Sequence, residues 1–440
     1  MVQALSLLAL VALFAVATLT PINMGILAFV AAFLVGAASG IDIEDIFGAF
    51  PGDTFVLLVG ITLLFGVARV NGTIDLVVAI SLRAVRGRRW AIVWLMFLLA
   101  GLLMSLGSVL AVAMLAPIAM PIAARYRISP LLMGMMLSHG ALSCAFSPIT
   151  VYGAFTRDMA SKAGIELGPL LLFAVPFALN VALASVLFFV LGRDLLRHAD
   201  SPDEDRVQLP EPSTAPGGGG TMTATPQTLA PTGTVTSTAV RATPIRVLTL
   251  TGMLGLIVGS AVFGLDVGVC ALVIAAALML ARPTGHKEAS DDIGWSAVLL
   301  VSGMLTYMAV LEQNKTLDLL GDGAAALGNP LLAALLLCFV VAVVSAFGSS
   351  IGTLGIALPV AFPLLEAGGG LSAVGFVLAL AFCSTVVDVS PYSTNGVIVL
   401  AQAQVDDKQR FQRKMFGYTA LVITGAPLLA WATVLAPSSL

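Results

Sequence analysis

The sequence predicts an all-α polytopic membrane protein made of two inverted repeats, each with five transmembrane spans and one re-entrant helical hairpin. Three observations support this fold class. Of the 440 residues, 59% are hydrophobic and only 10% are charged, which is far from the composition of a soluble domain of this size. Apolar stretches long enough to cross or enter a bilayer recur along the whole chain. The polar motifs between them occur twice, in the same order.

The first half, residues 1–198, contains five apolar stretches that we expect to span the membrane. They cover residues 5–19, 25–38, 55–70, 131–155 and 169–191. The fourth is interrupted at Ser147-Pro148, because proline removes a backbone donor and disfavours helix in the residue before it. An acidic loop is expected over residues 41–53. An amphipathic helix on the membrane surface is expected over residues 73–85, because that stretch is short and leads into a basic cluster.

Residues 90–124 form the expected hairpin of the first half. The stretch is long enough for two spans, yet basic residues stand at both of its ends, which indicates that both ends face the cytoplasm. A hairpin that enters the membrane and turns back satisfies this charge distribution, and so does a complete pair of spans. The small residues at its middle, Ser105-Leu-Gly-Ser108, and the internal repeat favour the hairpin.

Residues 199–246 differ from the rest of the chain, because they are rich in Pro, Gly, Thr and acidic side chains. This composition predicts a disordered cytoplasmic linker. The second half, residues 247–440, then retraces the first, with a hairpin over 331–366 and a span interrupted at Ser390-Pro391. Its five expected spans cover residues 247–263, 267–280, 298–311, 373–403 and 416–435, and its polar loops cover 282–292 and 406–414.

The two halves align by residue type. Asn71-Gly-Thr-Ile-Asp75 matches Asn314-Lys-Thr-Leu-Asp318, and Ser147-Pro148 matches Ser390-Pro391. We interpret Asn71 and Asn314 as caps of the helices that follow them. An odd number of spans per repeat inverts the second copy, so the hairpins enter from opposite sides and their tips meet near the midplane. With the basic clusters on the cytoplasmic side of the inner plasma membrane, both termini are expected outside the cytoplasm.

Several motifs carry a family resemblance. They are Phe50-Pro-Gly-Asp53, Asn71-Gly-Thr-Ile-Asp75, Ala116-Pro-Ile-Ala119, Ser138-His-Gly-Ala141 and Ser147-Pro148. Over most of its length the chain resembles the MatC-type dicarboxylate carriers of the ion-transporter superfamily, and it is similar, more distantly, to the divalent-anion/sodium symporters. The resemblance implies a malonate-, succinate- or malate-like substrate, sodium coupling, and an elevator mechanism in a homodimer. The symporters have Ser-Asn-Thr at each hairpin tip, whereas this chain has Gly107-Ser108-Val109 and Ser349-Ser350-Ile351.

A dicarboxylate requires hydrogen-bond donors and compensating positive charge. Apart from Arg69, near the end of a span, no Lys or Arg lies within the expected spans and hairpins. Hydroxyl groups, backbone amides and the positive ends of half-helices are therefore the expected donors. The candidate substrate-binding residues lie at the hairpin tips and helix breaks: Gly107, Ser108, Val109, Ser147, Pro148, Ser349, Ser350, Ser390, Pro391, Thr394 and Asn395. The alternative is that these small residues only let helices pack closely.

Sodium requires several oxygen ligands, and the same tips and breaks supply them. The candidate cation-binding residues are Ser105, Ser108, Ser147, Ser345, Ser349, Asp388 and Ser390. Asp388 is a carboxylate inside an expected span, where it is costly without a partner. Its expected role is to bind a cation, to carry a proton, or to form a structural hydrogen bond. His139 is a candidate proton relay and equally a packing histidine. No cofactor and no nucleic-acid partner are expected.

Two other classes of function compete with a dicarboxylate carrier. A cation/proton antiporter or an arsenite-type anion exporter of the same superfamily is expected to carry several acidic residues inside the membrane, and only Asp388 is clearly there. A membrane-embedded enzyme needs paired catalytic groups, such as a His-Glu-x-x-His motif, which the sequence lacks. We therefore expect a secondary transporter, not an enzyme, and leave open which dicarboxylate it carries.

Overall fold

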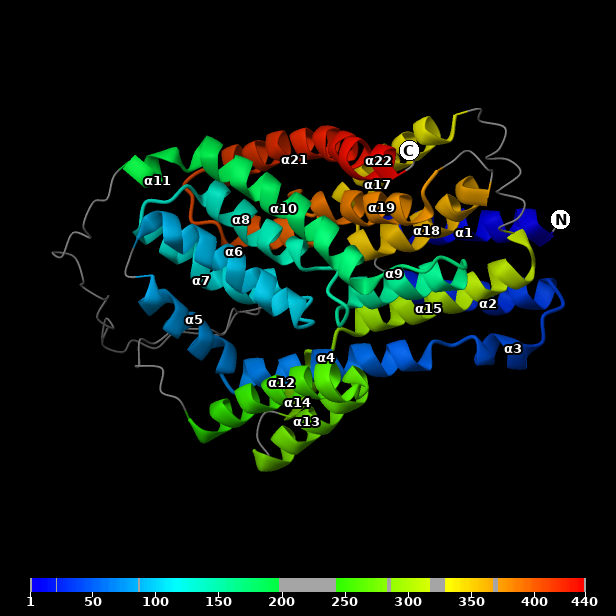
Figure 1. Ribbon diagram of the computed structural model, residues 1–440, viewed down its shortest axis with the longest axis horizontal. Coiled ribbons are helices and arrows are strands. Elements are labelled where there is room, and N and C mark those ends of the chain that lie inside the picture. The colour runs from blue at the N-terminus through cyan, green and yellow to red at the C-terminus, as the bar shows by residue number, and fades with distance from the viewer. Residues whose placement is uncertain are drawn as a thin grey trace, which may run out of the picture.

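The computed structural model describes residues 2–20, 22–85, 88–197, 243–282, 286–316, 329–366 and 371–438. These residues form helices joined by short turns, with no strand among them, which confirms the all-α prediction for this part of the chain (Figure 1). The first half contains α1 (Val2–Leu19), α2 (Met24–Ala38), α3 (Ile43–Gly48), α4 (Gly52–Val70), α5 (Thr73–Ala84), α6 (Arg89–Ser105), α7 (Ala111–Arg125), α8 (Pro130–Ser143), α9 (Val151–Lys162), α10 (Pro169–Leu191) and α11 (Arg193–Arg197). The second half contains α12 (Pro244–Phe263), α13 (Val267–Ala281), α14 (His286–Asp291), α15 (Trp295–Gln313), α17 (Pro330–Ala346), α18 (Ser350–Glu366), α19 (Ala373–Val386), α20 (Thr394–Gln402), α21 (Lys408–Ala430), the π-helix Trp431–Leu435 and α22 (Ala436–Ser438).

Several helices suit a bilayer by length and composition. Four stretches are long and apolar enough to cross a membrane: Ile43–Val70, Pro169–Leu191, Trp295–Gln313 and Lys408–Ser438. Further apolar helices of 10–17 residues accompany them, shorter than the roughly 20 residues that a perpendicular span requires. The chain is therefore a multi-pass membrane protein, while the count of five spans per half stays a prediction.

The structure differs from the sequence-based expectation at several boundaries. The acidic loop over 41–53 contains the short helix α3, and the polar loop over 282–292 contains α14. The basic loop over 406–414 is mostly helical, because α21 begins at Lys408. Helix α12 begins at Pro244, inside the segment expected to be linker. The rest of that linker, residues 199–242, lies outside the described residues.

Helix boundaries in the two halves correspond. Helices α13, α14, α15 and α19 each begin and end 243 residues after α2, α3, α4 and α8, respectively. The cap residues follow the same offset. Asn23 and Asp266 accept backbone hydrogen bonds at the starts of α2 and α13, and Ser129 and Ser372 do so at the starts of α8 and α19. The correspondence therefore extends from residue types to local hydrogen bonding.

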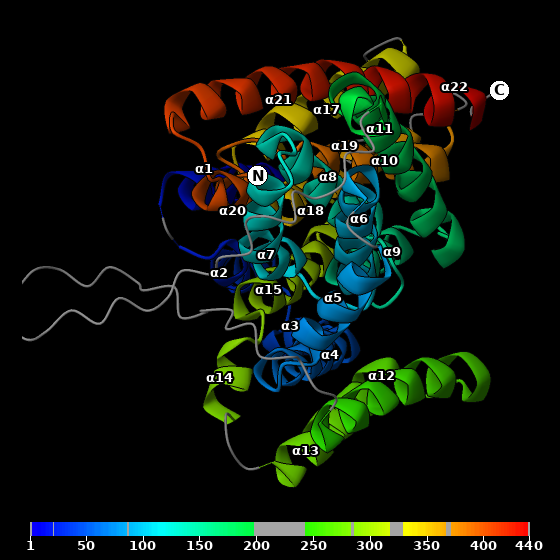
Figure 2. The same cartoon turned by 90° about the vertical axis from the view of Figure 1, so that its left-hand side faces the viewer.

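The two halves exchange helices in their packing. Helix α2 packs on α15, and its counterpart α13 packs on α4, so that each contact joins opposite halves. Figure 2 shows α12 and α13 together along one edge of the molecule, with α4 between them and the remaining helices. Both crossings are tight at glycine. A Cβ on Gly25 would lie 2.0 Å from the Leu299 carbonyl oxygen, and one on Gly60 would lie 2.4 Å from the Gly268 carbonyl oxygen. Only glycine permits so close an approach of two helix backbones.

The junctions that follow α4 and α15 share one hydrogen-bond pattern. The Asn71 side chain accepts from the Thr73 amide at 3.0 Å, at the start of α5, as the predicted capping role requires, and the Asn314 side chain accepts from the Thr316 amide at 3.1 Å. The helix expected after Asn314 lies outside the described residues, so its capping stays a prediction. The residue after each Asn is left-handed: Gly72 has φ 74° and Lys315 has φ 56°. Each junction thus contains one position that favours glycine, and the second half fills it with lysine.

Candidate functional site

The tip of the first hairpin is the turn over 106–110, between α6 and α7. Gly107 has φ 104°, and a Cβ there would lie 2.0 Å from the Ile61 side chain on α4, so both the backbone conformation and the packing require glycine. Ser108 is buried, and its amide donates to the Leu103 carbonyl at 3.0 Å. Val109 is half-buried. This tip therefore packs against α4, and Ser108 is its buried hydroxyl group.

The tip of the second hairpin lies between α17 and α18, and its serines occupy different environments. Ser349 is exposed, and its hydroxyl oxygen accepts weakly from the Gly352 amide at 3.4 Å, at the start of α18. Ser350 is buried, with its hydroxyl oxygen 3.2 Å from that of Ser345. Ser345 also donates to the carbonyl of Ser384 on α19, so the second tip is tied to the helix that precedes the second break.

The first helix break, between α8 and α9, brings its serine to the first hairpin tip. Ser147 donates through its hydroxyl to the Ser105 carbonyl at 2.8 Å, whereas the Ser105 hydroxyl donates to Leu102 in its own helix. The Ser147 carbonyl accepts from Thr150 twice, from the amide at 3.0 Å and from the hydroxyl at 2.8 Å. Pro148 is exposed.

The second break, between α19 and α20, repeats this backbone geometry. The Ser390 carbonyl accepts from Ser393 through the amide at 3.0 Å and the hydroxyl at 2.8 Å. A Cβ on Gly396 would lie 1.7 Å from the Ser390 carbonyl oxygen, as a Cβ on Gly153 would lie 2.1 Å from that of Ser147. Each of these carbonyls already has two donors. The hydroxyls of the two break serines, rather than their carbonyls, are therefore the oxygens available to an ion or substrate.

Asp388 distinguishes the second break from the first, where Ala145 occupies the corresponding position 243 residues earlier. Its side chain is buried. One carboxylate oxygen accepts from the Asn395 amide at 3.1 Å, and the other accepts from the Asn395 side-chain nitrogen at 3.0 Å. Asp388 thus lies at the N-terminus of α20, where the helix dipole favours negative charge. Thr394, beside Asn395, is exposed, and Pro391 is buried.

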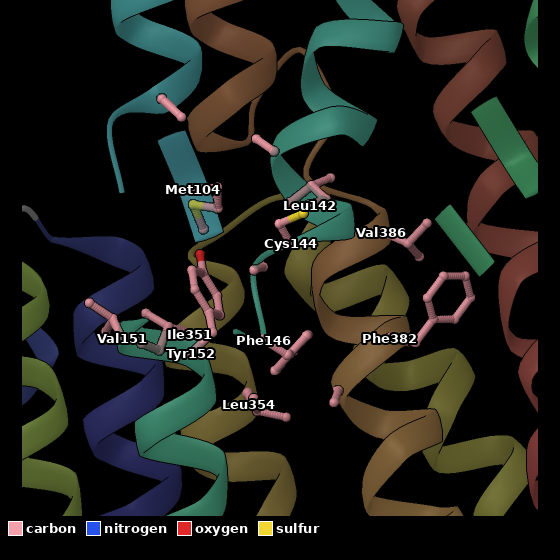
Figure 3. Close-up of a cluster of buried hydrophobic side chains, with 14 of the residues drawn as sticks. Met104, Leu142, Cys144, Phe146, Val151, Tyr152, Ile351, Leu354, Phe382 and Val386 are labelled. Carbon is pink, nitrogen blue, oxygen red and sulfur yellow. The ribbon is translucent and has the colours of Figure 1, made fainter. Parts of the chain in front are cut away.

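Tyr152 joins the two halves of the site, and sequence reasoning missed it. It is buried at the start of α9, where its hydroxyl interacts with Ser350 and, electrostatically, with Asp388. Figure 3 shows that hydroxyl pointing toward Met104, near the end of α6. The internal repeat contained a signal for this residue, because Tyr152 occupies the position that corresponds to Asn395.

His139 is buried on α8 between two polar partners. Its Nδ1 lies 3.0 Å from Asn180 Oδ1 on α10, and its Nε2 lies 2.6 Å from the Tyr418 hydroxyl on α21. Asn180 Oδ1 is an acceptor, so Nδ1 carries the proton and the neutral ring accepts from Tyr418 at Nε2. Both ring nitrogens are therefore engaged in contacts that connect three helices, which is the arrangement of a packing histidine.

Arg69, the one basic residue expected within a span, is held away from the tips by an ion pair. Its Nε and Nη2 donate to both oxygens of Asp292, in the loop before α15. Burial raises the pKa of the Asp292 carboxyl above its usual range, although the adjacent guanidinium acts in the opposite direction. Arg69 therefore links α4 to the α14–α15 segment.

The second tip also contains an enzyme-like pattern. Gly348-Ser-Ser-Ile-Gly352 has the Gly-x-Ser-x-Gly spacing of hydrolases, in which the serine stands on a strand-to-helix turn. Here Ser350 begins α18 directly after another helix, so the strand that defines that turn is missing at this place. The structural context therefore does not match a nucleophile elbow.

The fold and the paired helix breaks define a class, the helical membrane transporters. Residues 1–145 match the family of the dicarboxylate carrier protein MatC N-terminus, and residues 256–437 match the citrate transporter family. Both families lie in the ion-transporter superfamily, and the two matches, one in each half, support a carrier of the MatC dicarboxylate type rather than an enzyme.

Comparison with solved structures supports the fold alone. The structure of MtrF from Neisseria gonorrhoeae, reported as illuminating a class of antimetabolite efflux pumps, is similar with a TM-score of 0.56 and 12% sequence identity. The similarity covers 89% of this chain and 83% of MtrF. No curated protein matches the chain.

Proposed function

We propose that this protein is a secondary transporter of small dicarboxylates that couples substrate movement to sodium and works by an elevator mechanism. The observation that supports this function best is the match of each half to a carboxylate carrier family, together with paired hairpin tips and helix breaks of like geometry. Broken helices at corresponding places of two repeats are the usual location of a transporter's binding site.

Substrate carboxylates bind at the two tips and breaks. Ser349 is exposed at the start of α18, and Thr394 is exposed at the start of α20, so each offers a hydroxyl beside a positive helix end. The buried polar groups behind them complete the site: Ser108, Ser147, Ser350, Ser390 and Asn395. Gly107 and Pro391 shape the backbone, while Val109 and Pro148 border the first tip.

Sodium supplies the positive charge that this site needs. The substrate is an anion, and Asp388 adds a further buried negative charge with no salt bridge among the described residues. A cation beside the hydroxyls of the break serines offsets both charges. The candidate ligands are Ser105, Ser108 and Ser147 in one half, and Ser345, Ser349, Asp388 and Ser390 in the other.

The two halves lie as inverted repeats in the inner plasma membrane, with both termini outside the cytoplasm, and two copies form a homodimer. The hairpins α6–α7 and α17–α18 enter from opposite sides without crossing. The exchanged pairs α2–α15 and α4–α13 form a fixed scaffold, because their glycine crossings leave no room for sliding. The hairpins and broken helices move as one body against it.

The test is uptake of labelled malonate and succinate into proteoliposomes, with and without an inward sodium gradient. Sodium-driven uptake is expected in the wild type and is expected to be lost in the double variant Ser349→Ala with Ser350→Ala. Ser185→Ala is the matched control, because that hydroxyl bonds only within α10, to the Val181 carbonyl. No uptake of either acid by folded protein would reject the dicarboxylate function and favour the anion-exporter alternative.

A further inference from the structure

Helices α9 and α20 correspond in the repeat but have different surroundings. Helix α9 packs on α15 and α4 of the scaffold as well as on α18 and α10, whereas α20 packs on α7, α8 and α21. Ala154 on α9 is 1% exposed, while Val397, its counterpart on α20, is 48% exposed. One broken helix is therefore docked on the scaffold, and the other is largely free of it.

Two polar contacts hold α9 in its docked position. Thr54, at the start of α4, donates its hydroxyl to the Asp158 carboxylate. The Lys162 ammonium donates to the Leu305 carbonyl of α15 at 2.9 Å. Asp158 and Lys162 are four residues apart, so both lie on one face of α9, and that face meets both scaffold helices.

At the corresponding positions, which the structure describes, the second half has no equivalent of these contacts. The positions that correspond to Asp158 and Lys162 are Ala401 and Val405, and Ala297 corresponds to Thr54. None of these three side chains forms a hydrogen bond. The polar contacts therefore stabilise only one of the two arrangements that the repeat symmetry allows.

We propose that Asp158 and Lys162 lock the moving body in one end state, and that in the opposite end state α20 docks on the scaffold in place of α9, with Ala401 against Ala297. This inference rests on the elevator movement of the proposed function. Exchanging the roles of the two halves turns the contact of Thr54 with Asp158 into a contact of Ala297 with Ala401. The docking contact is polar in the state seen here and apolar in the opposite state. The lock therefore shifts the resting population toward the state seen here.

Cysteine cross-linking of the full chain in proteoliposomes tests the proposal. The first pair, Thr54→Cys with Asp158→Cys, reports the state seen here, and the second pair, Ala297→Cys with Ala401→Cys, reports the opposite state. The four native cysteines are replaced by alanine in every variant, because free thiols would compete in the oxidation: Cys144, Cys270, Cys338 and Cys383. The control pair is Asn23→Cys with Ser296→Cys, whose native side chains lie 2.8 Å apart within the scaffold.

Both test pairs are expected to cross-link with copper phenanthroline and to lose uptake until a reductant is added, while the cross-linked control pair keeps its uptake. Adding Lys162→Met to the second pair is expected to raise its cross-linking rate at least threefold.

Absence of the second cross-link, or full uptake by the cross-linked first pair, would overturn the exchange of docked helices. An unchanged rate with Lys162→Met would overturn the lock. If no carboxylate is taken up before oxidation, the proposed substrate class fails, yet the cross-links still test the movement.

Discussion

The side-chain nitrogen of Asn314 lies 2.9 Å from the hydroxyl oxygen of Ser6, although the two residues are separated by most of the chain. The same contact occurs between Asn71 and Thr249, at 2.7 Å, and both residues of this pair are offset from the first by 243 positions. Each Asn thus accepts from the backbone amide two residues further on, at the end of its own scaffold helix, and bonds to the first helix of the other half.

We expect Asn314→Ala to destabilise the protein more than Asn329→Ala does. Both side chains accept a backbone hydrogen bond in the manner of a cap, which contributes about 1 kcal/mol, but only Asn314 also reaches the other half. Thermal unfolding of the purified chain in detergent measures the difference. In a double-mutant cycle with Ser6→Ala, the coupling is expected to be about 0.5–1.5 kcal/mol. Zero coupling would mean that the contact does not stabilise the junction.

Lys315→Gly is expected to stabilise the protein by about 1 kcal/mol, because Lys315 is left-handed and lysine is strained there. Gly72→Ala, at the corresponding position, is expected to destabilise by a similar amount. Glu312→Gly is the control, and it is expected to lower the stability instead, since glycine within the regular helix α15 costs about 1 kcal/mol. Thermal unfolding decides the sign in each case, and a lower melting temperature for Lys315→Gly would contradict the strain.

Gly25→Ala is expected to abolish folded protein, because its Cβ would lie 2.0 Å from a carbonyl oxygen of α15. The backbone there belongs to a packed helix and has no room to shift. Size-exclusion chromatography of the expressed protein measures the folded fraction. Gly48→Ala is the control, since nothing lies within 4 Å of the Cβ it would add. A normal elution profile for Gly25→Ala would show that the α2–α15 contact is looser than described.

Asp388→Asn is expected to reduce sodium-driven uptake at least tenfold. The substitution keeps the shape of the side chain and removes the buried charge. It also replaces one carboxylate oxygen, which now accepts a hydrogen bond from Asn395, with an amide group that can only donate. Asp292→Asn is the matched control, because that carboxylate pairs with Arg69 outside the site and its change is expected to leave uptake within twofold. Uptake that keeps its rate and its sodium dependence in Asp388→Asn would remove Asp388 from the coupling site.

Tyr418→Phe is expected to cost about 1–2 kcal/mol of stability, because it leaves His139 Nε2 buried without its partner. The pH dependence of uptake is expected to stay the same, since both ring nitrogens of the wild-type histidine are bonded within the protein. Uptake across a pH series, together with thermal unfolding, measures both effects. A pH profile altered by this variant would restore His139 as a proton relay.

The positions of the helix breaks were predictable from the sequence, because proline after serine in an apolar stretch removes a backbone donor locally, as at Ser147 and Ser390. The backbone hydrogen bonds that Asn71 and Asn314 accept were predictable for the same local reason. The role of Lys162 was not predictable, since it depends on which helices of the other half pack against α9, and Tyr152 could be found only through its correspondence with Asn395. Helices α3 and α14 were missed because short polar helices have no long apolar pattern to reveal them.

The exchange of α2 and α13 between the halves has a consequence for biogenesis. Helix α2 leaves the ribosome long before α15 exists, and α4 likewise precedes α13, so the glycine faces of the first half stay uncovered while the second is being made. Contacts between such distant segments form late and slowly. The partner at each glycine crossing of a scaffold helix belongs to the other half. A chain divided between residues 198 and 247 is therefore expected to function only when both fragments are made in the same cell.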